Sequence, residues 1–362
     1  MIDTAIFKTD RFSRFAEKKE YVFSAPSNIA LVKYWGKKKN QIPANPSLSF
    51  TLKNSKTVTR LVAEPKEDRN ISFDLLFEGQ PKESFRPKIQ KYFERIEELC
   101  PYIRDYHFTI DTHNTFPHSS GIASSASGMA ALSSGIMALE KDIYPGQPEG
   151  YYEHKASLLA RLGSGSACRS INGNIVVWGQ TESIEGSTDL YGIPFPAEVH
   201  EVFRNYQDTI LLVDKGEKQV SSTVGHELMH GHPYAETRFA QAHGNIAVLK
   251  EILESGDLPK FIGLVESEAL TLHAMMMTSM PYFILMKPNT LEIIQQVWKF
   301  RKETGIPVCF TLDAGANVHV LYPYNDKVKV REFIEEKLAS FCQNGQFIHD
   351  EMGSGAENIG IK

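Results

Sequence analysis

Cysteine is scarce in this sequence, and its spacing is uninformative for metal binding. The 362 residues include four cysteines, at positions 100, 168, 309 and 342, and no two of them form a C-x-x-C pair. A disulfide framework and a cysteine-based zinc site are therefore excluded. This usage is typical of a reducing compartment, and we expect a cytoplasmic protein.

Long apolar runs and a strong charge of either sign are also absent. No stretch approaches the roughly 18 apolar residues of a membrane span, and the first twenty residues lack the apolar core of a signal peptide. The net charge of −5 and the pI near 6.2 give no general attraction to nucleic acid or to an anionic membrane. We expect neither as a partner. Small anionic molecules remain open as ligands.

The composition is that of a globular protein with two cores. Hydrophobic residues make up 42% and charged residues 23%, and the length suits two domains. Residues 180–200 are rich in Gly, Pro and acidic side chains, so we place the boundary there. The expected domains are residues 1–190 and 191–362.

The hydrophobic patterns predict a mixed first half and a more regular second half. In the first half we expect helices over 87–99, 124–139 and 153–162, and strands over 107–112 and 174–179. In the second half we expect strands over 209–213, 308–312, 318–322 and 346–349, with helices within 234–279 and over 291–303 and 328–341. This order is β-α-β-β-α-β with extra helices, a split βαβ arrangement. The fold class is therefore α+β.

A loop of small residues runs directly into a predicted helix at Phe116–Gly128, in the sequence FPHSSGIASSASG. Small side chains let backbone N–H groups approach an anion, and the start of a helix favours negative charge. The loop predicts a phosphate site, although such a loop alone more often only turns the chain. The Walker pattern G-x-x-x-x-G-K-[ST] is absent.

Two other segments carry cations in unusual surroundings. Lys33 lies in the apolar, strand-like run NIALVKYWGK that begins at Asn28. Arg169 lies in a second small-residue loop, GSGSACRS, which begins at Gly163. One guanidinium beside hydroxyls and free amides is typical of a carboxylate or phosphate clamp.

The pattern H-E-x-x-H also occurs, at His226–His230. On a helix this pattern places two imidazoles one turn apart for zinc, with the glutamate as base. Gly231-His-Pro233 breaks the helix directly after the second histidine, however, and the longer metalloprotease pattern does not continue. We therefore interpret these residues as surface and helix-start histidines near a turn, and keep zinc chemistry as an alternative.

Taken together, five segments resemble the diphosphomevalonate decarboxylase family of the GHMP kinase superfamily. The resemblance runs from about residue 21 to Gly355. It is carried by 25–37, 116–128, 163–170, 220–223 and 313–317. It implies a two-domain GHMP kinase-like fold, with a C-terminal ferredoxin-like domain, an active site in the cleft between the domains, and a homodimer.

The resemblance implies ATP- and Mg²⁺-dependent decarboxylation of mevalonate 5-diphosphate to isopentenyl diphosphate, with release of ADP, phosphate and carbon dioxide. Two other activities stay open. Relatives that decarboxylate a 5-monophosphate or a 3,5-bisphosphate keep similar cores, and a plain GHMP kinase would stop at the phosphorylated product. A kinase needs no clamp for a departing carboxylate, so Arg169 favours decarboxylation.

The resemblance also assigns roles to individual residues. Asp313 matches the catalytic aspartate that orients or deprotonates the substrate hydroxyl, Lys33 the lysine beside it, and Arg169 the arginine that holds the substrate carboxylate. The implied substrate-binding residues are Asn28, Tyr34, Lys37, Ser164, Ser166 and Lys88. The implied nucleotide-binding residues are Pro117, Ser120, Gly121, Ala123, Ser124, Ser125 and Ala126, with Ser125 also at Mg²⁺.

The sequence departs from the family pattern in three places. His118-Ser-Ser-Gly121 stands for the usual T-A-A-G, Asn45-Pro-Ser47 for N-S-S, and Asp313-Ala-Gly-Ala-Asn317 for D-A-G-P-N. None of these changes removes the aspartate, the lysine or the arginine. His273 also falls on a family-like stretch, where helix packing and function are equally good readings.

Overall fold

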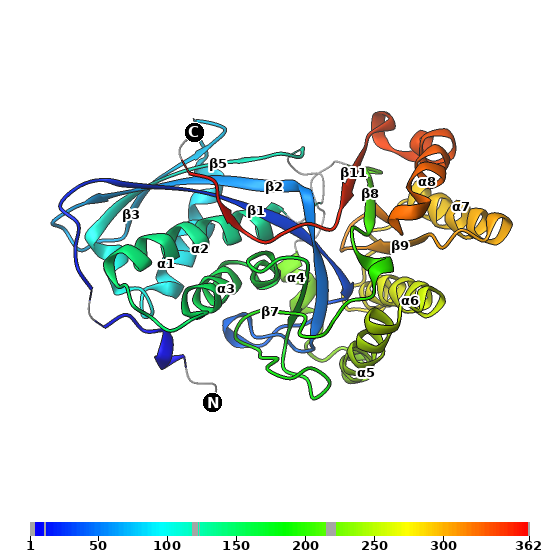
Figure 1. Cartoon of the computed structure of the whole chain (residues 1–362), viewed down its shortest axis with the longest axis horizontal. Coiled ribbons are helices and arrows are strands. Elements are labelled where there is room, and N and C mark those ends of the chain that lie inside the picture. Colours follow the sequence, from blue (N-terminus) through cyan, green and yellow to red (C-terminus); the bar gives the residue numbers. More distant parts are fainter. Residues whose placement is uncertain (1–3, 11, 118–121, 123, 215–221, 361–362) are drawn as a thin grey trace.

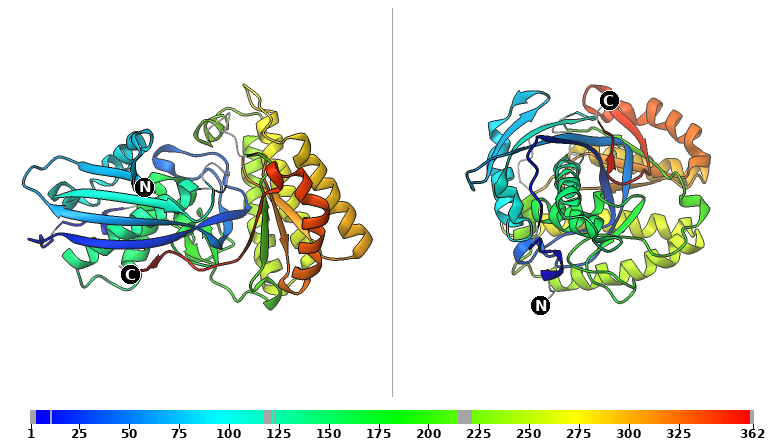
Figure 2. Two further views of the ribbon diagram at one scale, coloured as in Figure 1. Left: turned by 90° about the horizontal axis from the view of Figure 1, so that it is seen from above. Right: turned by 60° about the vertical axis from the view of Figure 1, so that its left-hand side comes forward.

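The computed structural model describes residues 4–10, 12–117, 122, 124–214 and 222–360. Within these residues it has two parts, each built on its own β-sheet, that lie side by side (Figures 1 and 2). The expected α+β fold is confirmed. None of the described helices is long and apolar enough to span a bilayer.

The larger sheet belongs to the N-terminal part and runs in the order β12-β1-β2-β5-β3-β4, with β6 and β7 continuing from β2. Most of its pairs are antiparallel, but β3 and β5 are parallel. Its strands are β1 (Lys19–Val32), β2 (Ser47–Pro65), β3 (Ser72–Phe77), β4 (Gln80–Pro81), β5 (Tyr106–Asn114), β6 (Ile175–Trp178), β7 (Ile193–Pro194) and β12 (Glu357–Asn358).

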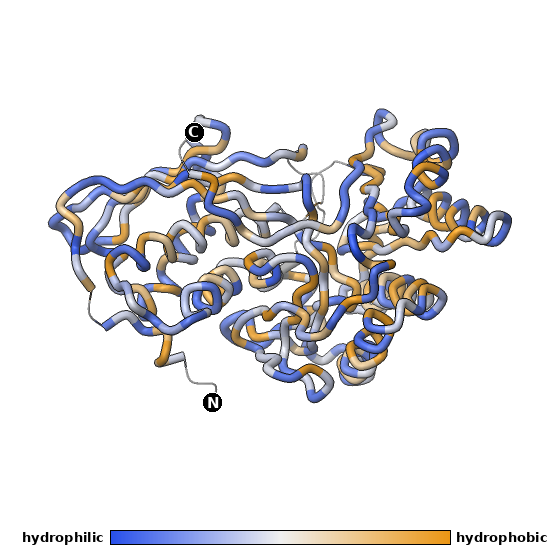
Figure 3. Tube along the Cα trace, in the orientation of Figure 1, coloured by the Kyte–Doolittle hydropathy of each residue, from blue (hydrophilic) through white to orange (hydrophobic). Residues whose placement is uncertain are grey.

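Three helices cover one face of this sheet: α1 (Arg86–Ile96), α2 (Ser124–Ile143) and α3 (Tyr151–Gly163). In α1, Ile89, Tyr92, Phe93 and Ile96 recur at helical spacing and are all buried. In α2, Gly135 lies against Leu61 of β2, where an added Cβ would come within 3.1 Å of a leucine methyl carbon. The hydrophobic and hydrophilic colours that alternate along the helices in Figure 3 reflect these one-sided faces.

The second sheet runs in the order β11-β8-β10-β9, and all its pairs are antiparallel. Its strands are β8 (Gln207–Leu211), β9 (Cys309–Leu312), β10 (Val318–Tyr322) and β11 (Phe347–Glu351). The helices of this part are α4 (Ser222–Glu227), α5 (Ala235–Ser255), α6 (Leu258–Met277), α7 (Pro288–Thr304) and α8 (Lys327–Phe333). The chain order confirms the predicted split βαβ arrangement.

The end of the predicted helix over 328–341 is not regular. After α8 the chain continues as a short π-helix at Ile334–Leu338 and a 3₁₀ turn at Ala339–Phe341. The buried residues Val330, Phe333, Ile334 and Leu338 keep their apolar face on the sheet through this change. The apolar pattern predicted the extent of this segment, but it does not distinguish one helical hydrogen-bond ladder from another.

The C-terminal segment ties the two parts together. The carboxylate of Asp350 accepts hydrogen bonds from the backbone N–H groups of Lys53, Asn54 and Ser55 in β2, at 2.8–2.9 Å. Beyond β11 the chain crosses back, and β12 pairs with Phe23 and Ser24 of β1. The red end of the ribbon in Figure 1 follows this return.

Candidate active site

Lys33 and Asp313 meet at the junction of the two parts. Lys33 directly follows β1 and is only 1% exposed, and Asp313 directly follows β9. The Lys33 Nζ lies 3.2 Å from Asp313 Oδ1, although 280 positions separate them in sequence. Burial lowers the pKa of Lys33, and the Asp313 carboxylate opposes that effect. The ammonium group is thus held beside one acid in a water-poor site.

The backbone of Lys33 is fixed from both sides by a buried ion pair. Glu268 of α6 accepts a hydrogen bond from the Lys33 N–H at 2.8 Å, and Arg238 of α5 donates to the Lys33 carbonyl oxygen at 3.2 Å. Arg238 and Glu268 contact each other at 2.6 Å and are both almost fully buried. The helical part therefore positions the lysine that the N-terminal part supplies.

His273 holds the backbone of Asp313 in a similar way. Its Nε2 lies 3.1 Å from the Asp313 carbonyl oxygen, which can only accept, so Nε2 carries the proton. Burial lowers the pKa of His273 to about 4, so the ring is neutral near pH 7. His273 thus supports the aspartate without adding charge.

Arg169 is buried beside this pair, in the 3₁₀ segment Gly165–Ser170. Its Nη1 donates to the Ser47 hydroxyl, its Nε donates to Asn28 Oδ1 at 3.4 Å, and its guanidinium lies over the Trp178 ring at 5.9 Å. Burial lowers the pKa of Arg169, while the charge of Asp313 acts against this shift. Arg169, Lys33 and Asp313 therefore interact within one site.

Asn28 orients the Arg169 segment through its amide group. Its Nδ2 donates to Ser170 Oγ at 2.8 Å and to the Ser166 carbonyl oxygen at 3.2 Å, in addition to the contact from Arg169. This network joins β1 to the loop that follows α3. Both the Oδ1 and the Nδ2 of Asn28 are thus hydrogen-bonded to protein groups.

The predicted phosphate loop lies only partly within the described residues. Ser120, Gly121 and Ala123 fall outside them, and Pro117 is exposed at the edge of the gap. Ser124, Ser125 and Ala126 form the first turn of α2. The exposed Ser125 hydroxyl lies 3.3 Å from that of Ser164, which places the start of α2 beside the Arg169 loop.

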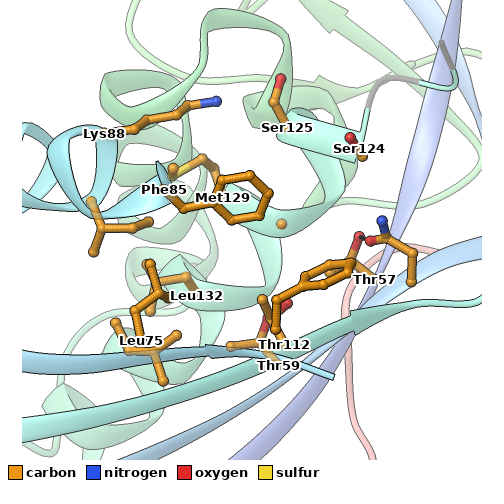
Figure 4. A pocket seen from close by; sticks show the side chains of 15 residues that line it. Thr57, Thr59, Leu75, Phe85, Lys88, Thr112, Ser124, Ser125, Met129 and Leu132 are labelled. Atoms are coloured by element: carbon orange, nitrogen blue, oxygen red, sulfur yellow. Dashed lines mark hydrogen bonds between the residues drawn. The ribbon is translucent and has the colours of Figure 1, made fainter. Parts of the chain in front are cut away.

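An apolar cavity of about 190 Å³ opens beside this helix start (Figure 4). It lies between the sheet and the helices α1 and α2. Ser125 and Lys88 stand at one end of it, and Leu75 and Leu132 at the other. Lys88 is exposed by area, but the surrounding protein desolvates its ammonium group and lowers its pKa.

Tyr34 and Lys37 lie on the segment that follows β1. The Tyr34 ring packs on Trp178 with centroids 4.6 Å apart, and burial raises the pKa of its hydroxyl. An added Cβ at Gly165 would lie 2.9 Å from the Tyr34 hydroxyl, so glycine permits this contact. Lys37 Nζ lies 3.9 Å from Glu227 of α4, and partial burial lowers the pKa of Lys37.

Sequence comparison places the chain among known enzymes. The diphosphomevalonate decarboxylase-like N-terminal domain matches residues 25–189, and the mevalonate 5-diphosphate decarboxylase C-terminal domain matches residues 209–358. The diphosphomevalonate decarboxylase of Gibberella zeae is 31% identical over 84% of this chain and 81% of its own length. The chain belongs to the diphosphomevalonate decarboxylase family.

Solved structures of the family have the same fold. The mevalonate diphosphate decarboxylase from Staphylococcus aureus is 28% identical, with a TM-score of 0.80 over 95% of this chain and 98% of its own. MDDEF in complex with MVAPP, AMPPCP and magnesium is 25% identical, with a TM-score of 0.80 over 94% and 98%. The two-domain GHMP kinase-like expectation is thereby confirmed.

One of the two histidines of the H-E-x-x-H pattern does not lie as we expected from the sequence. His230 is exposed, but His226 is buried between the rings of Tyr34 and Trp35. The interpretation of His226 as a surface histidine is wrong, because the side of α4 that carries His226 packs against the segment after β1. Across the described ranges, no cluster of three His, Cys, Asp or Glu side chains is arranged to hold a metal ion.

The sequence patterns did not reveal that Arg238 and Glu268 belong to the candidate site. Both lie in the long helical pattern over 234–279, where a charged residue is usually solvated. Opposite charges on two different helices give no local signal of pairing. Only the packing of α5 against α6 and β1 brings them to Lys33.

Proposed function

We propose that this protein catalyses the ATP-dependent decarboxylation of mevalonate 5-diphosphate to isopentenyl diphosphate, releasing ADP, phosphate and carbon dioxide. The observation that carries the proposal is the 3.2 Å contact between Lys33 and Asp313, with the buried Arg169 interacting with both. An acid, an amine and a guanidinium in one site suit a substrate with a hydroxyl and a carboxylate. The family membership supports the same reaction.

Phosphoryl transfer is the first step of the proposed reaction. Asp313 accepts the proton of the substrate 3-hydroxyl as that oxygen attacks the γ-phosphorus of ATP, and the bond to the bridging oxygen breaks to release ADP. Lys33 keeps Asp313 ionised and offsets negative charge on the transferred group. General-base help of this kind is worth about 10²- to 10⁴-fold.

Decarboxylation is the second step. The C3–O bond breaks, and phosphate leaves with the electron pair. As positive charge develops at C3, the C1–C2 bond breaks, carbon dioxide leaves, and its electrons form the C2–C3 double bond. Arg169 holds the C1 carboxylate through its planar fork until that bond breaks.

The nucleotide fits between α2 and the apolar cavity. We place its phosphates at the first turn of α2, near Ser124 and Ser125, where backbone N–H groups lack helical partners. Its base would occupy the cavity beside Thr57 and Met129. The exposed Ser125 hydroxyl suits Mg²⁺ as an oxygen ligand, and the ion would neutralise phosphate charge when bound.

The 5-diphosphate would lie beside the segment that follows β1 and the loop that carries Arg169. Its proposed partners are Tyr34, Lys37, Ser164 and Ser166, with Asn28 orienting the loop and Lys88 near the phosphates. Lys37 supports this assignment, because its partner Glu227 is 62% exposed and 3.9 Å away, a contact weak enough to exchange for a phosphate.

The deciding experiment separates the three candidate activities. The protein is incubated with ATP, Mg²⁺ and either mevalonate 5-diphosphate or mevalonate 5-phosphate, and ADP and carbon dioxide are followed together. The proposal expects both products from the diphosphate. ADP without carbon dioxide would indicate a kinase, and a preference for the monophosphate would indicate a phosphomevalonate decarboxylase.

We also propose that the protein is a cytoplasmic homodimer. The family resemblance supports the pairing, and the four buried free cysteines suit a reducing compartment. Size-exclusion chromatography with light scattering should give twice the mass of the 40.7 kDa chain. A monomer mass at micromolar concentration would contradict the pairing, and recovery in a membrane or secreted fraction would contradict the location.

A further inference from the structure

His226 occupies an unusual place for a residue without a role in the reaction above. It lies in the last turn of α4, and its ring packs against Tyr34 at 4.2 Å and Trp35 at 4.7 Å between centroids. Its Nδ1 lies 3.0 Å from the backbone nitrogen of Gly36. The ring therefore docks on the segment that carries two of the proposed diphosphate partners, Tyr34 and Lys37.

The contact with Gly36 fixes the tautomer of His226. A backbone N–H can only donate, so Nδ1 must accept and Nε2 must carry the ring proton. The ring is neutral near pH 7, because burial, followed by the charges of Lys37 and Arg169, lowers its pKa to about 3. His226 thus offers one N–H donor that no physiological pH removes.

That donor has no protein acceptor among the described residues. The Gly36 contact is the only hydrogen bond of the His226 ring within them, and Nε2 is not one of the fully enclosed polar atoms that lack a partner. The residue keeps 8% of its surface exposed. Because the Nε2–H keeps access to the surface and has no protein acceptor among the described residues, a ligand acceptor can take the place of water there.

The charges around the ring indicate the kind of acceptor. Lys37 and Arg169 are the two cations whose fields reach His226. Under the proposed function, one binds the substrate phosphates and the other the C1 carboxylate. An N–H donor in the field of two such cations suits an anionic oxygen.

We infer that His226 is a substrate-binding residue whose Nε2–H donates a hydrogen bond to the 5-diphosphate. This inference rests on the proposed function and adds to it a donor that the motifs did not assign. His226 and Glu227 of the H-E-x-x-H pattern then both serve the binding of the diphosphate. His226 binds the diphosphate, and Glu227 holds Lys37 near it until the substrate arrives.

Two substitutions separate the donor from the contact to Gly36. His226→Asn keeps an acceptor near the Nδ1 position and removes the Nε2–H, whereas His226→Gln keeps a donor near Nε2 and removes the acceptor. His230→Asn is the matched control, because it makes the same change at an exposed histidine of the same pattern. Each variant is assayed for the KM of mevalonate 5-diphosphate and of ATP.

The expected result is a KM for mevalonate 5-diphosphate about tenfold or more higher in His226→Asn, as for a lost hydrogen bond to a charged group, with the KM for ATP unchanged. His226→Gln should lose less, and His230→Asn nothing. An unchanged KM in His226→Asn would overturn the inference. So would a larger loss in His226→Gln, which would leave only the positioning of Gly36.

Direct binding keeps this test separate from the proposed reaction. Calorimetric titration with mevalonate 5-diphosphate reports the lost affinity of His226→Asn even if the wild-type protein releases no carbon dioxide. NMR of the wild-type protein gives a second measurement, in which a His226 variant serves only to assign the signal. In ¹⁵N-histidine-labelled protein, the His226 Nε2–H signal should move on addition of mevalonate 5-diphosphate. A signal that stays in place at saturation would contradict the inference.

Discussion

Asp313 is the central residue of the proposed chemistry, because the buried Lys33 Nζ lies beside it and has no other carboxylate oxygen within 4 Å among the described residues. We predict that Asp313→Asn lowers kcat by about 10²- to 10⁴-fold while ATP still binds. Carbon dioxide release and a nucleotide titration measure the two effects. Asp10→Asn, at an exposed site, is the control, and undiminished turnover in Asp313→Asn would remove the assigned base.

Substitution of Arg169 tests whether its guanidinium holds the substrate carboxylate. Lysine keeps the charge but loses the fork that reaches Ser47 and Asn28, so we predict that Arg169→Lys lowers kcat/KM for decarboxylation by roughly 10²-fold. Arg204→Lys, at a mostly exposed arginine, should leave kcat/KM unchanged. If Arg169→Lys performed as well as the wild type, a point charge would suffice and the fork would have no part in the reaction.

Helices α5 and α6 act on the site through one buried charge. Glu268 raises the pKa of Lys33, against the larger effect of burial, which lowers it; Asp313 also raises it and Arg169 lowers it. The proposed reaction requires the charged form of Lys33. Removing the Glu268 charge lowers that pKa further, so Lys33 becomes neutral at a lower pH.

We therefore predict that Glu268→Gln moves the alkaline limb of the kcat/KM profile to lower pH, by roughly half a pH unit or more. Rates measured from pH 6 to pH 10 show the shift, and Glu254→Gln, at an exposed position, is the matched control. A profile that only drops in height would mean that Glu268 serves the packing of α5 and α6 and not the charge of Lys33.

Most strands and helices of the second half were predictable from the sequence. The split βαβ order was predictable because short apolar runs alternate with long amphipathic stretches in the second half. The helix expected over 291–303 begins earlier than predicted, because Pro288 forms part of its first turn. Proline fits the first turn of a helix, where its missing N–H costs nothing, and α7 begins at Pro288.

The candidate site divides in the same way. Lys33, Arg169 and Asp313 were found because each lies in a motif that resembles a family, and the structure places them in mutual contact or electrostatic reach. Arg238, Glu268 and the burial of His226 depend on packing between distant elements, which no local pattern encodes. The roles assigned to the nucleotide and diphosphate residues, and the domain boundary near residue 190, stay predictions.

At the scale of the whole molecule, the C-terminal tail braces the Arg169 loop. Ala356 donates its N–H to the carbonyl oxygen of Ile171 at 2.9 Å, and a Cβ at Gly355 would lie 2.2 Å from the same oxygen. Ile171 directly follows the segment Gly165–Ser170. The tail is thus packed directly against the end of the segment that carries Arg169.

We predict that Gly355→Ala lowers stability by about 2 kcal/mol through overpacking and lowers kcat/KM because Ile171 and the clamp must shift. Urea unfolding and steady-state rates measure both. Gly263→Ala, in open space on α6, should not destabilise the protein. Equal stability of Gly355→Ala and the wild type would show that the tail is not tightly packed there.

Decarboxylation by this protein is tested by following both products of a single turnover. The enzyme is mixed in excess with ATP, Mg²⁺ and mevalonate 5-diphosphate labelled at C1, and ADP and labelled carbon dioxide are counted together over time. The wild type should release one carbon dioxide for each ADP, and Asp313→Asn should form both products at least about 10²-fold more slowly. ADP that accumulates from the wild type without carbon dioxide would contradict the proposed decarboxylation.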